Sequence, residues 1–188
     1  MSSRREAILS TAVRLFSANG YHATGIDRVI KESGVAKMTL YNHFGSKEEL
    51  ILAALRRWDE DSRRWLMNEI NARGTTPRER LLVLFDVLDE WFDQQNFKGC
   101  MFINATAEYS DPDDPIHAAA AEHKRLFRRF LRDQVAQLGV ENIDQVTDQM
   151  ALLMEGAIVT TQVHQQRGAG QRAKSVATAL LDAVRVAA

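Results

Sequence analysis

The sequence contains little of what breaks or cross-links a fold: among 188 residues there are one cysteine, three prolines and ten glycines. The single cysteine, Cys100, excludes an intramolecular disulfide framework and agrees with a reducing compartment. So few helix-breaking residues favour an all-α fold with short connections. No apolar run reaches the length of about 18 residues that a membrane helix needs, and the first residues lead into a polar helix rather than a signal sequence. We therefore expect a cytoplasmic protein with no membrane contact.

The sequence also lacks the common motifs of metal-dependent and phosphate-binding enzymes. It contains no His-Glu-x-x-His, no paired cysteines and no glycine-rich phosphate loop. Of its five histidines, His117 and His123 are six residues apart and fall on different faces of a helix. We predict no catalytic residues, no metal site and no cofactor, so an enzyme is the weaker interpretation.

The net charge is only −1, but it is unevenly distributed. Residues 1–57 contain nine basic and five acidic side chains, a net charge of +4, whereas residues 58–188 contain 15 basic and 20 acidic ones, a net charge of −5. A basic N-terminal part on an acidic body would present one surface to phosphate and repel it elsewhere. A chance distribution of solvated charges explains the same counts.

Residues 24–50 predict two short helices around a glycine, the layout of a helix-turn-helix. Thr24 is expected to cap the first helix with its hydroxyl. The apolar face of that helix is made by Ile26, Val29 and Ile30. Gly34 is expected to end it, because glycine accepts the left-handed backbone of a sharp turn. The second helix, roughly residues 37–44, is expected to bury Leu40 and Phe44 and to leave its polar side chains outside.

The segment Gly-Val-Ala-Lys-Met-Thr-Leu-Tyr-Asn-His-Phe-Gly-Ser-Lys-Glu-Glu-Leu, residues 34–50, resembles the recognition helix and following helix start of TetR/AcrR-type transcriptional repressors. The resemblance extends upstream over the first third of the chain through the spacing of Ile8, Ala12, Leu15, Phe16 and Gly20. Residues 99–109 resemble a weaker signature of the regulatory domains of some members. The resemblance implies about nine helices, with a helix-turn-helix DNA-binding domain over residues 1–46 and an effector-binding and dimerisation domain over residues 47–188.

The resemblance implies a homodimeric regulator, most simply a repressor, that binds palindromic double-stranded operator DNA and is released by a small, hydrophobic effector. The expected DNA contacts are Thr24, Lys37, Met38, Thr39, Tyr41, Asn42, His43 and Lys47. Lys47 is expected to clamp the DNA backbone, because it lies in the first turn of a helix whose N-terminus attracts phosphate. Tyr41 could instead pad the helical core, and Lys37 and Asn42 could be exposed without a role.

Later helices are predicted from capping and breaking residues. Ser46 and Glu49 have capping-box spacing for a helix to about Ile70, and Thr76 and Pro77 are expected to open the next. Further helices are expected over about residues 100–109 and from the two prolines after residue 110 to about residue 138. The basic run from Lys124 to Arg132 is interpreted as a solvated face rather than a second DNA surface.

The last two predicted helices, residues 146–164 and the helix after Gly168, carry more apolar surface than one core easily covers. The first of them has two apolar stripes and therefore needs two partners. A dimer in which two helices per subunit form a four-helix bundle satisfies this need. The expected interface is Leu152, Gly156, Val159, Val163, Ala173, Ala177, Leu180 and Val184. The alternative is a monomer in which the first of these helices is fully buried.

Bulky and polar residues between residues 65 and 154 are candidates for an effector pocket. They are Trp65, Phe85, Leu88, Trp91, Phe102, Asn104, Glu108, Tyr109, His123, Phe127 and Met154. Aromatic residues at helical spacing more often fill a core than line a pocket, and His123 is equally explained as a core histidine with its hydrogen bonds satisfied. The alternative function is a helix-turn-helix protein with no small-molecule effector, whose C-terminal part only dimerises or binds a protein partner.

Overall fold

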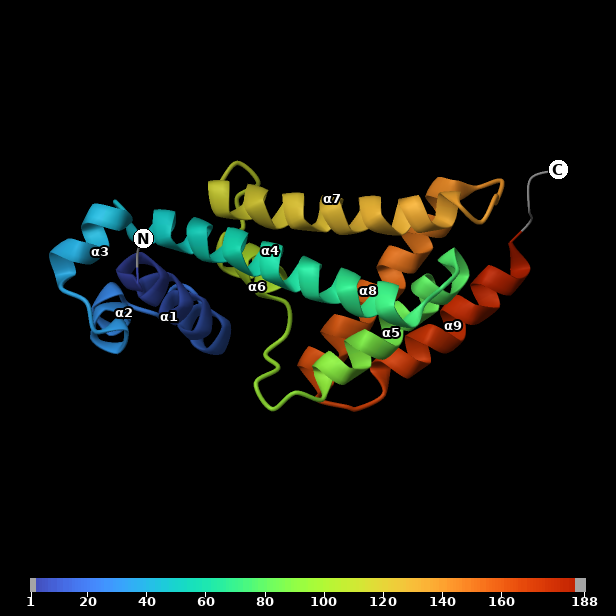
Figure 1. Cartoon of the computed structure of the whole chain (residues 1–188), viewed down its shortest axis with the longest axis horizontal. Helices are drawn as coiled ribbons and strands as arrows, with labels where there is room; N and C mark the ends of the chain where they lie inside the picture. The colour runs from blue at the N-terminus through green and yellow to red at the C-terminus, as the bar shows by residue number, and fades with distance from the viewer. Residues whose placement is uncertain (1–2, 185–188) are drawn as a thin grey trace. The chain divides into compact units, whose positions relative to one another are not determined.

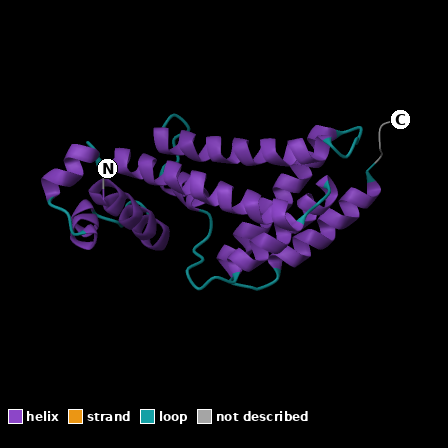
Figure 2. Ribbon diagram, viewed as in Figure 1, coloured by secondary structure: helices purple, strands orange, loops and turns teal. Residues whose placement is uncertain are grey.

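The computed structural model describes residues 3–184, and all regular secondary structure in that range is helical (Figure 2). The nine helices of this range are α1 (Ser3–Asn19), α2 (Ile26–Ser33), α3 (Lys37–His43), α4 (Lys47–Arg73), α5 (Pro77–Phe92), α6 (Met101–Glu108), α7 (Pro115–Ala136), α8 (Ile143–His164) and α9 (Ala169–Ala183) (Figure 1). The predicted all-α class is confirmed. Within the described range no helix has the length and apolarity to cross a membrane.

Contacts between residues divide the described chain into two compact units. Unit 1 comprises residues 3–62 and 100–123, and unit 2 comprises residues 63–99 and 124–184. The boundaries fall inside α4 and α7, so each of these helices contributes its first part to unit 1 and its second part to unit 2.

In unit 1, helices α1, α2 and α3 pack together as a three-helix cluster. Val29 of α2 and Leu40 of α3 have no exposed surface, and Phe44 is buried at the end of α3. Gly34 follows α2 with φ +70°, the left-handed conformation that its position predicted. The predicted helix-turn-helix is therefore present, with α3 one residue shorter than expected.

The prediction that Thr24 caps α2 is wrong. The N-cap residue is Gly25, which makes no side-chain capping bond. Thr24 lies one residue further out, and its hydroxyl donates instead to the carbonyl oxygen of Gly20 at 2.7 Å. Its side chain therefore closes the α1–α2 loop, residues 20–25, from the inside.

Two other predicted helix starts are observed. At α5, Thr76 and Glu79 form the reciprocal capping box, with Pro77 in the first turn. At α4, the Ser46 hydroxyl accepts the Glu49 N–H at 3.1 Å. The Glu49 carboxylate, however, accepts the N–H of Gly45, one residue earlier than a capping box requires.

Helix α6 is bonded to the α1–α2 loop at both of its ends. The Glu108 carboxylate accepts the backbone N–H of Tyr21 at 2.8 Å and that of His22 at 2.5 Å, and it also contacts His22 Nδ1 at 2.8 Å. At the other end of α6, the buried Tyr21 hydroxyl donates to the carbonyl oxygen of Met101 at 2.8 Å. We call these contacts of Glu108 and Tyr21 the loop latch. The latch joins both ends of α6 to the loop between the first two helices of unit 1.

The latch changes the ionisation of its own groups. Burial raises the pKa of Glu108, but the hydrogen bonds from the His22 and Tyr21 N–H groups and the His22 ring outweigh it, so the pKa is lowered from 4.5. Burial raises the pKa of the Tyr21 hydroxyl, which stays a neutral donor.

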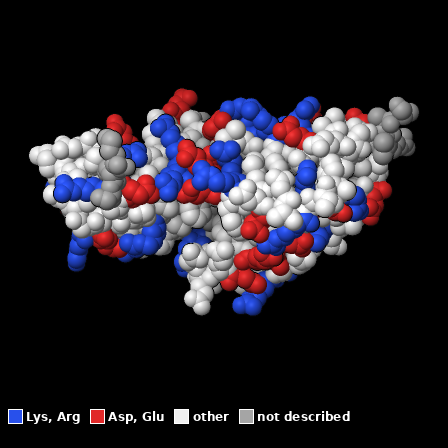
Figure 3. All heavy atoms as spheres, viewed as in Figure 1, with Lys and Arg blue, Asp and Glu red and all other residues white. Residues whose placement is uncertain are grey.

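Unit 2 is built on α5, α8 and α9, which pack against one another. The basic residues of α7 pair with acidic residues at the start of α8: Arg128 Nε lies 2.6 Å from Asp148, and Arg132 Nε lies 3.0 Å from Asp144. Figure 3 shows the same mixture of positive and negative side chains over the face in view. These pairs agree with the interpretation of the basic run as a solvated face.

We predict that Glu108→Gln lowers the free energy of unfolding by about 1 to 3 kcal/mol near neutral pH, because it removes the charge from the latch bonds. Since the folded pKa of Glu108 is lowered, its stabilisation is complete above the unfolded value of 4.5 and disappears as the pH falls through the folded pKa. Denaturant unfolding of both proteins between pH 7 and pH 3 measures this. A difference that stays constant across that range would contradict the assignment.

Candidate functional site

Helix α3 presents its predicted contact residues on an open surface. Met38 is 71% exposed, and Lys37, Tyr41, Asn42 and His43 are also exposed, while Thr39 is half-buried. Leu40, on the other side of the helix, has no exposed surface. The burial of one side therefore aims lysine, amide, imidazole and phenol groups outward together, and these groups suit phosphate oxygens and base edges.

Lys47 lies at the first residue of α4, where the helix N-terminus adds a partial positive charge. Its Nζ donates to the carbonyl oxygen of His22 at 3.3 Å, so the ammonium is held beside the α1–α2 loop. Lys37 Nζ lies 3.5 Å from Asp27 in an exposed pair, which costs little to break.

Thr24 does not belong to this surface. Its side chain has no exposed area, and its hydroxyl proton is donated inside unit 1. The prediction that it touches phosphate is wrong for this conformation, because the residue closes the loop instead of facing outward.

Arg5 is a cation at this end of unit 1 that the sequence interpretation did not single out. Its guanidinium carbon lies 5.1 Å from the centre of the Phe44 ring, directly after α3. Such a cation–π contact holds a positive charge beside the end of α3. The sequence signal was the adjacent pair Arg4 and Arg5, which entered only the charge count.

A cavity of about 360 Å³ lies in unit 1 among α4, α6 and α7. Its apolar lining residues are Leu52, Leu55, Phe102, Pro115, Ala118 and Ala119, and its polar ones are Arg56, Asp59, Glu122 and His123. This composition, apolar walls with a few polar groups, is typical of a small-molecule site. We call it the unit 1 cavity.

Two of the predicted ligand residues, Phe102 and His123, meet in this cavity. Their rings stack with centroids 3.6 Å apart, and His123 Nδ1 lies 2.6 Å from Asp59 Oδ1. Asp59 was missed from the sequence, although it lies one helical turn after Leu55 on the face of α4 that lines the cavity.

Glu108 and Tyr109 were predicted as ligand residues, and the structure assigns them elsewhere. Glu108 forms the loop latch, and the Tyr109 ring stacks on the His22 ring with centroids 4.8 Å apart. Asn104, on the same helix, does not line the unit 1 cavity. Glu108 and Tyr109 contact the α1–α2 loop, and this contact could not be read from the sequence of α6 alone.

The remaining ligand candidates do not line the unit 1 cavity, and most are core. Phe85, Leu88, Phe127 and Met154 are buried. Trp91 packs edge-on against Phe97 with ring centroids 4.8 Å apart, and Trp65 is exposed on α4. The burial of these four residues agrees with the alternative that they fill the core instead of lining a pocket.

The face of α8 that was expected to meet a second subunit is open. Leu152 is 73% and Val163 is 66% exposed, Val159 is also exposed, and nothing lies within 4 Å of a Cβ added at Gly156. These four residues recur at helical spacing and form one apolar stripe, which we call the α8 stripe.

The expected contribution of α9 needs correction. Ala173 and Ala177 are buried inside unit 2, so neither is available to a partner in this conformation. Leu180 and Val184 are half-exposed, and Val176, which was not predicted, is 55% exposed. The exposed face of α9 is thus rotated from the expected one, because its small alanines pack against its neighbours in the subunit.

The sequence matches two family descriptions that together span both units. Residues 8–54 match "Bacterial regulatory proteins, tetR family", and residues 77–177 match "Tetracyclin repressor-like, C-terminal domain". The second match alone covers more than half of the chain.

Individual proteins agree with these matches. The transcriptional regulator LmrA of Bacillus subtilis is 33% identical over 137 residues, which cover 72% of this chain and 72% of LmrA. YjdC of Escherichia coli is 27% identical over 155 residues, 82% of this chain and 81% of YjdC. The crystal structure of SCO4454 from Streptomyces coelicolor superposes with a TM-score of 0.89 at 28% identity, covering 97% of this chain and 90% of that one. The chain therefore belongs to the TetR family of bacterial regulatory proteins, which are ligand-responsive, DNA-binding transcriptional regulators that act as dimers.

Proposed function

We propose that this protein binds a palindromic operator through α3 and the start of α4, and that an apolar effector in the unit 1 cavity weakens this binding. The observation that carries the proposal is that α6 connects the cavity to the loop beside Lys47: Phe102 lines the cavity, and Glu108 bonds His22, whose carbonyl oxygen accepts from Lys47. A DNA-binding regulator acts where its operator is, so the proposed location is the cytoplasm.

On the DNA side, the exposed groups divide by chemistry. Lys47, Thr39, Tyr41 and His43 suit phosphate oxygens and would set the register of the protein on the duplex. The side chains for base edges in the major groove are Lys37, Met38 and Asn42. Two copies of α3 would read half-sites about 34 to 36 Å apart, one helical turn of DNA.

The α8 stripe supports the proposed dimer contact. An exposed apolar row of this kind is rare on a monomer and typical of a subunit interface. With the two-fold symmetry usual for homodimers, each stripe would meet its own copy, and Gly156 would permit close approach of the two α8 helices.

The unit 1 cavity supports the effector response. An effector that pushes against Phe102 would shift α6, and the latch would pass this shift to the α1–α2 loop. The loop residues that Glu108 bonds include His22, whose carbonyl oxygen accepts the hydrogen bond from Lys47. The effector acts only through its different affinity for the two conformers. A coupling of about 1 to 3 kcal/mol would weaken operator binding about 5- to 150-fold.

We predict that Lys47→Ala weakens binding to operator and to unrelated DNA by the same factor, and lowers the slope of log affinity against log salt by about 0.9, because one phosphate contact is lost. Lys37→Ala or Asn42→Ala should instead change the preference among sequences. Fluorescence anisotropy at several salt concentrations measures both effects. Lys47→Arg, which keeps the charge, and Lys98→Ala in unit 2 are the controls. An unchanged salt slope in Lys47→Ala would reject the phosphate contact.

We predict that Leu152→Glu combined with Val163→Glu abolishes the dimer, because charges on the α8 stripe would be buried without partners. Sedimentation velocity should then report a particle of 21.2 kDa instead of twice that mass. Gln137→Glu adds a charge at an exposed position directly after α7 and should leave the dimer intact. A double variant that sediments as a dimer would remove the stripe from the interface.

We predict that Ala119→Phe fills the unit 1 cavity and blocks the effector response while operator affinity is kept. Small hydrophobic compounds should be screened by thermal shift, since a compound at 100 times its Kd adds about 2.7 kcal/mol to the stability of the wild-type protein. Ala121→Phe, two residues further along α7 and outside the cavity lining, is the control. If no compound stabilises the wild-type protein, the alternative without a small-molecule effector is favoured.

A further inference from the structure

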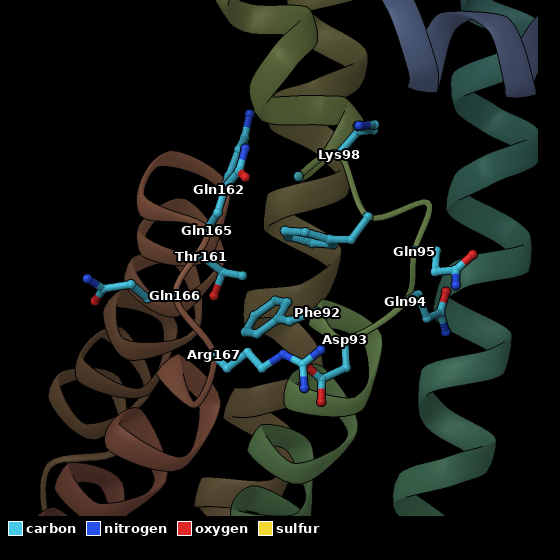
Figure 4. Close-up of a pocket in the computed structure, with 12 residues that line it drawn as sticks. Phe92, Asp93, Gln94, Gln95, Lys98, Thr161, Gln162, Gln165, Gln166 and Arg167 are labelled. Carbon is cyan, nitrogen blue, oxygen red and sulfur yellow. The ribbon is translucent and has the colours of Figure 1, made fainter.

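Unit 2 contains a cavity of its own, of about 300 Å³, where the end of α5 and residues 93–99 meet the end of α8 and the residues that follow it. Figure 4 shows Phe92 and Asp93 on one side of the opening and Thr161, Gln162 and Gln165 on the other. Every lining residue belongs to unit 2, so this unit 2 cavity is distinct from the proposed effector cavity.

The glutamines among the lining residues are Gln94, Gln95, Gln162, Gln165 and Gln166. Figure 4 shows Gln162 and Gln165 at the opening, whereas Gln94, Gln95 and Gln166 extend away from it. The amides of Gln162 and Gln165 each offer donors and an acceptor without a net charge, so they can bond a neutral ligand that has both kinds of group on its edge. Thr161 donates its proton to the carbonyl oxygen of Ala157 at 2.9 Å and keeps its hydroxyl oxygen as an acceptor.

The backbone conformation of Gln165 also supports a ligand in this cavity. Gln165 has φ +51°, and it is the sole non-glycine residue of the described chain with positive φ. It caps α8 by donating its N–H to the carbonyl oxygen of Thr161, a role that glycine performs at lower cost. The cap therefore does not explain the glutamine side chain, whereas a ligand in the cavity that it lines would explain it.

Aromatic rings supply the apolar part of the lining. The Phe92 and Phe97 rings lie with centroids 5.2 Å apart at 60°, and Phe97 is held edge-on by Trp91 and remains half-exposed. A half-exposed ring of fixed orientation can stack against a flat ligand. At the rim, Arg167 Nε lies 3.5 Å from Asp93 in an exposed pair that a ligand can displace.

We propose that the unit 2 cavity binds a purine nucleoside as a second small-molecule ligand. A purine is flat, neutral and edged with donors and acceptors, and proteins bind such bases by aromatic stacking combined with amide hydrogen bonds. The volume is at the lower end of small-molecule pockets and suits a ligand of this size. The assignment does not depend on the effector cavity or on the DNA contacts.

Isothermal titration calorimetry of the full chain with adenosine and guanosine tests this proposal, with ribose as the probe for a sugar site. The expected result is saturable binding of at least one nucleoside and none of ribose. Gln165→Gly removes the amide but keeps the left-handed backbone, and Phe97→Leu removes the ring. Each variant should weaken nucleoside binding at least tenfold. Gln137→Ala, at an exposed position directly after α7, is the control and should leave nucleoside binding unchanged.

The proposal is overturned if neither nucleoside binds at millimolar concentration, or if ribose alone binds as tightly. It is also overturned if both cavity variants bind like the wild-type protein, or if Ala119→Phe abolishes nucleoside binding while Gln165→Gly preserves it. The last result would place the ligand in the unit 1 cavity.

Discussion

The carboxylate of Glu108, which accepts two successive backbone N–H groups, holds the reading part of unit 1 in place. Residues 20–25 form a tight connection between α1 and α2, and their N–H groups have few helical partners. A negative charge at the end of α6 supplies the acceptor, and Tyr21 bonds the other end of the same helix. A short helix distant in sequence therefore constrains the start of α2, and through α2 and its glycine turn the reading helix α3.

Under the proposed function, this constraint would give the family's ligand response a physical route in the present chain. The unit 1 cavity and the loop latch share α6, so a molecule that displaces Phe102 cannot leave Glu108 undisturbed unless the eight-residue helix deforms. The Asp59–His123 pair is buried and hydrogen-bonded, and the His123 ring stacks on Phe102, so a ligand in the cavity would contact α6 and α7 together. A response would thus arise because the ligand in the unit 1 cavity and the loop latch favour different positions of α6.

In unit 2, charge and apolar surface are separated on α8. Asp144 and Asp148 pair with arginines of α7, and the buried residues of α8 face its own subunit. The apolar row from Leu152 to Val163 is left exposed. Ion pairs thus lie on one side of the helix and an exposed apolar row on another, and this row is the surface that we propose meets a partner subunit.

Short-range chemistry along the chain was sufficient to predict the helices, the Gly34 turn, the burial of Leu40 and Phe44 and the helix start at Thr76 and Pro77, because each depends on residues within about one helical turn. Packing between distant residues decided the rest. Glu108 meets His22 across 86 residues of sequence, and His123 meets Asp59 across 64, so no local pattern could distinguish a latch from a ligand contact. Likewise, Ala173 and Val176 differ in sequence only by position on α9, and the neighbouring helices determined that the first is buried and the second exposed.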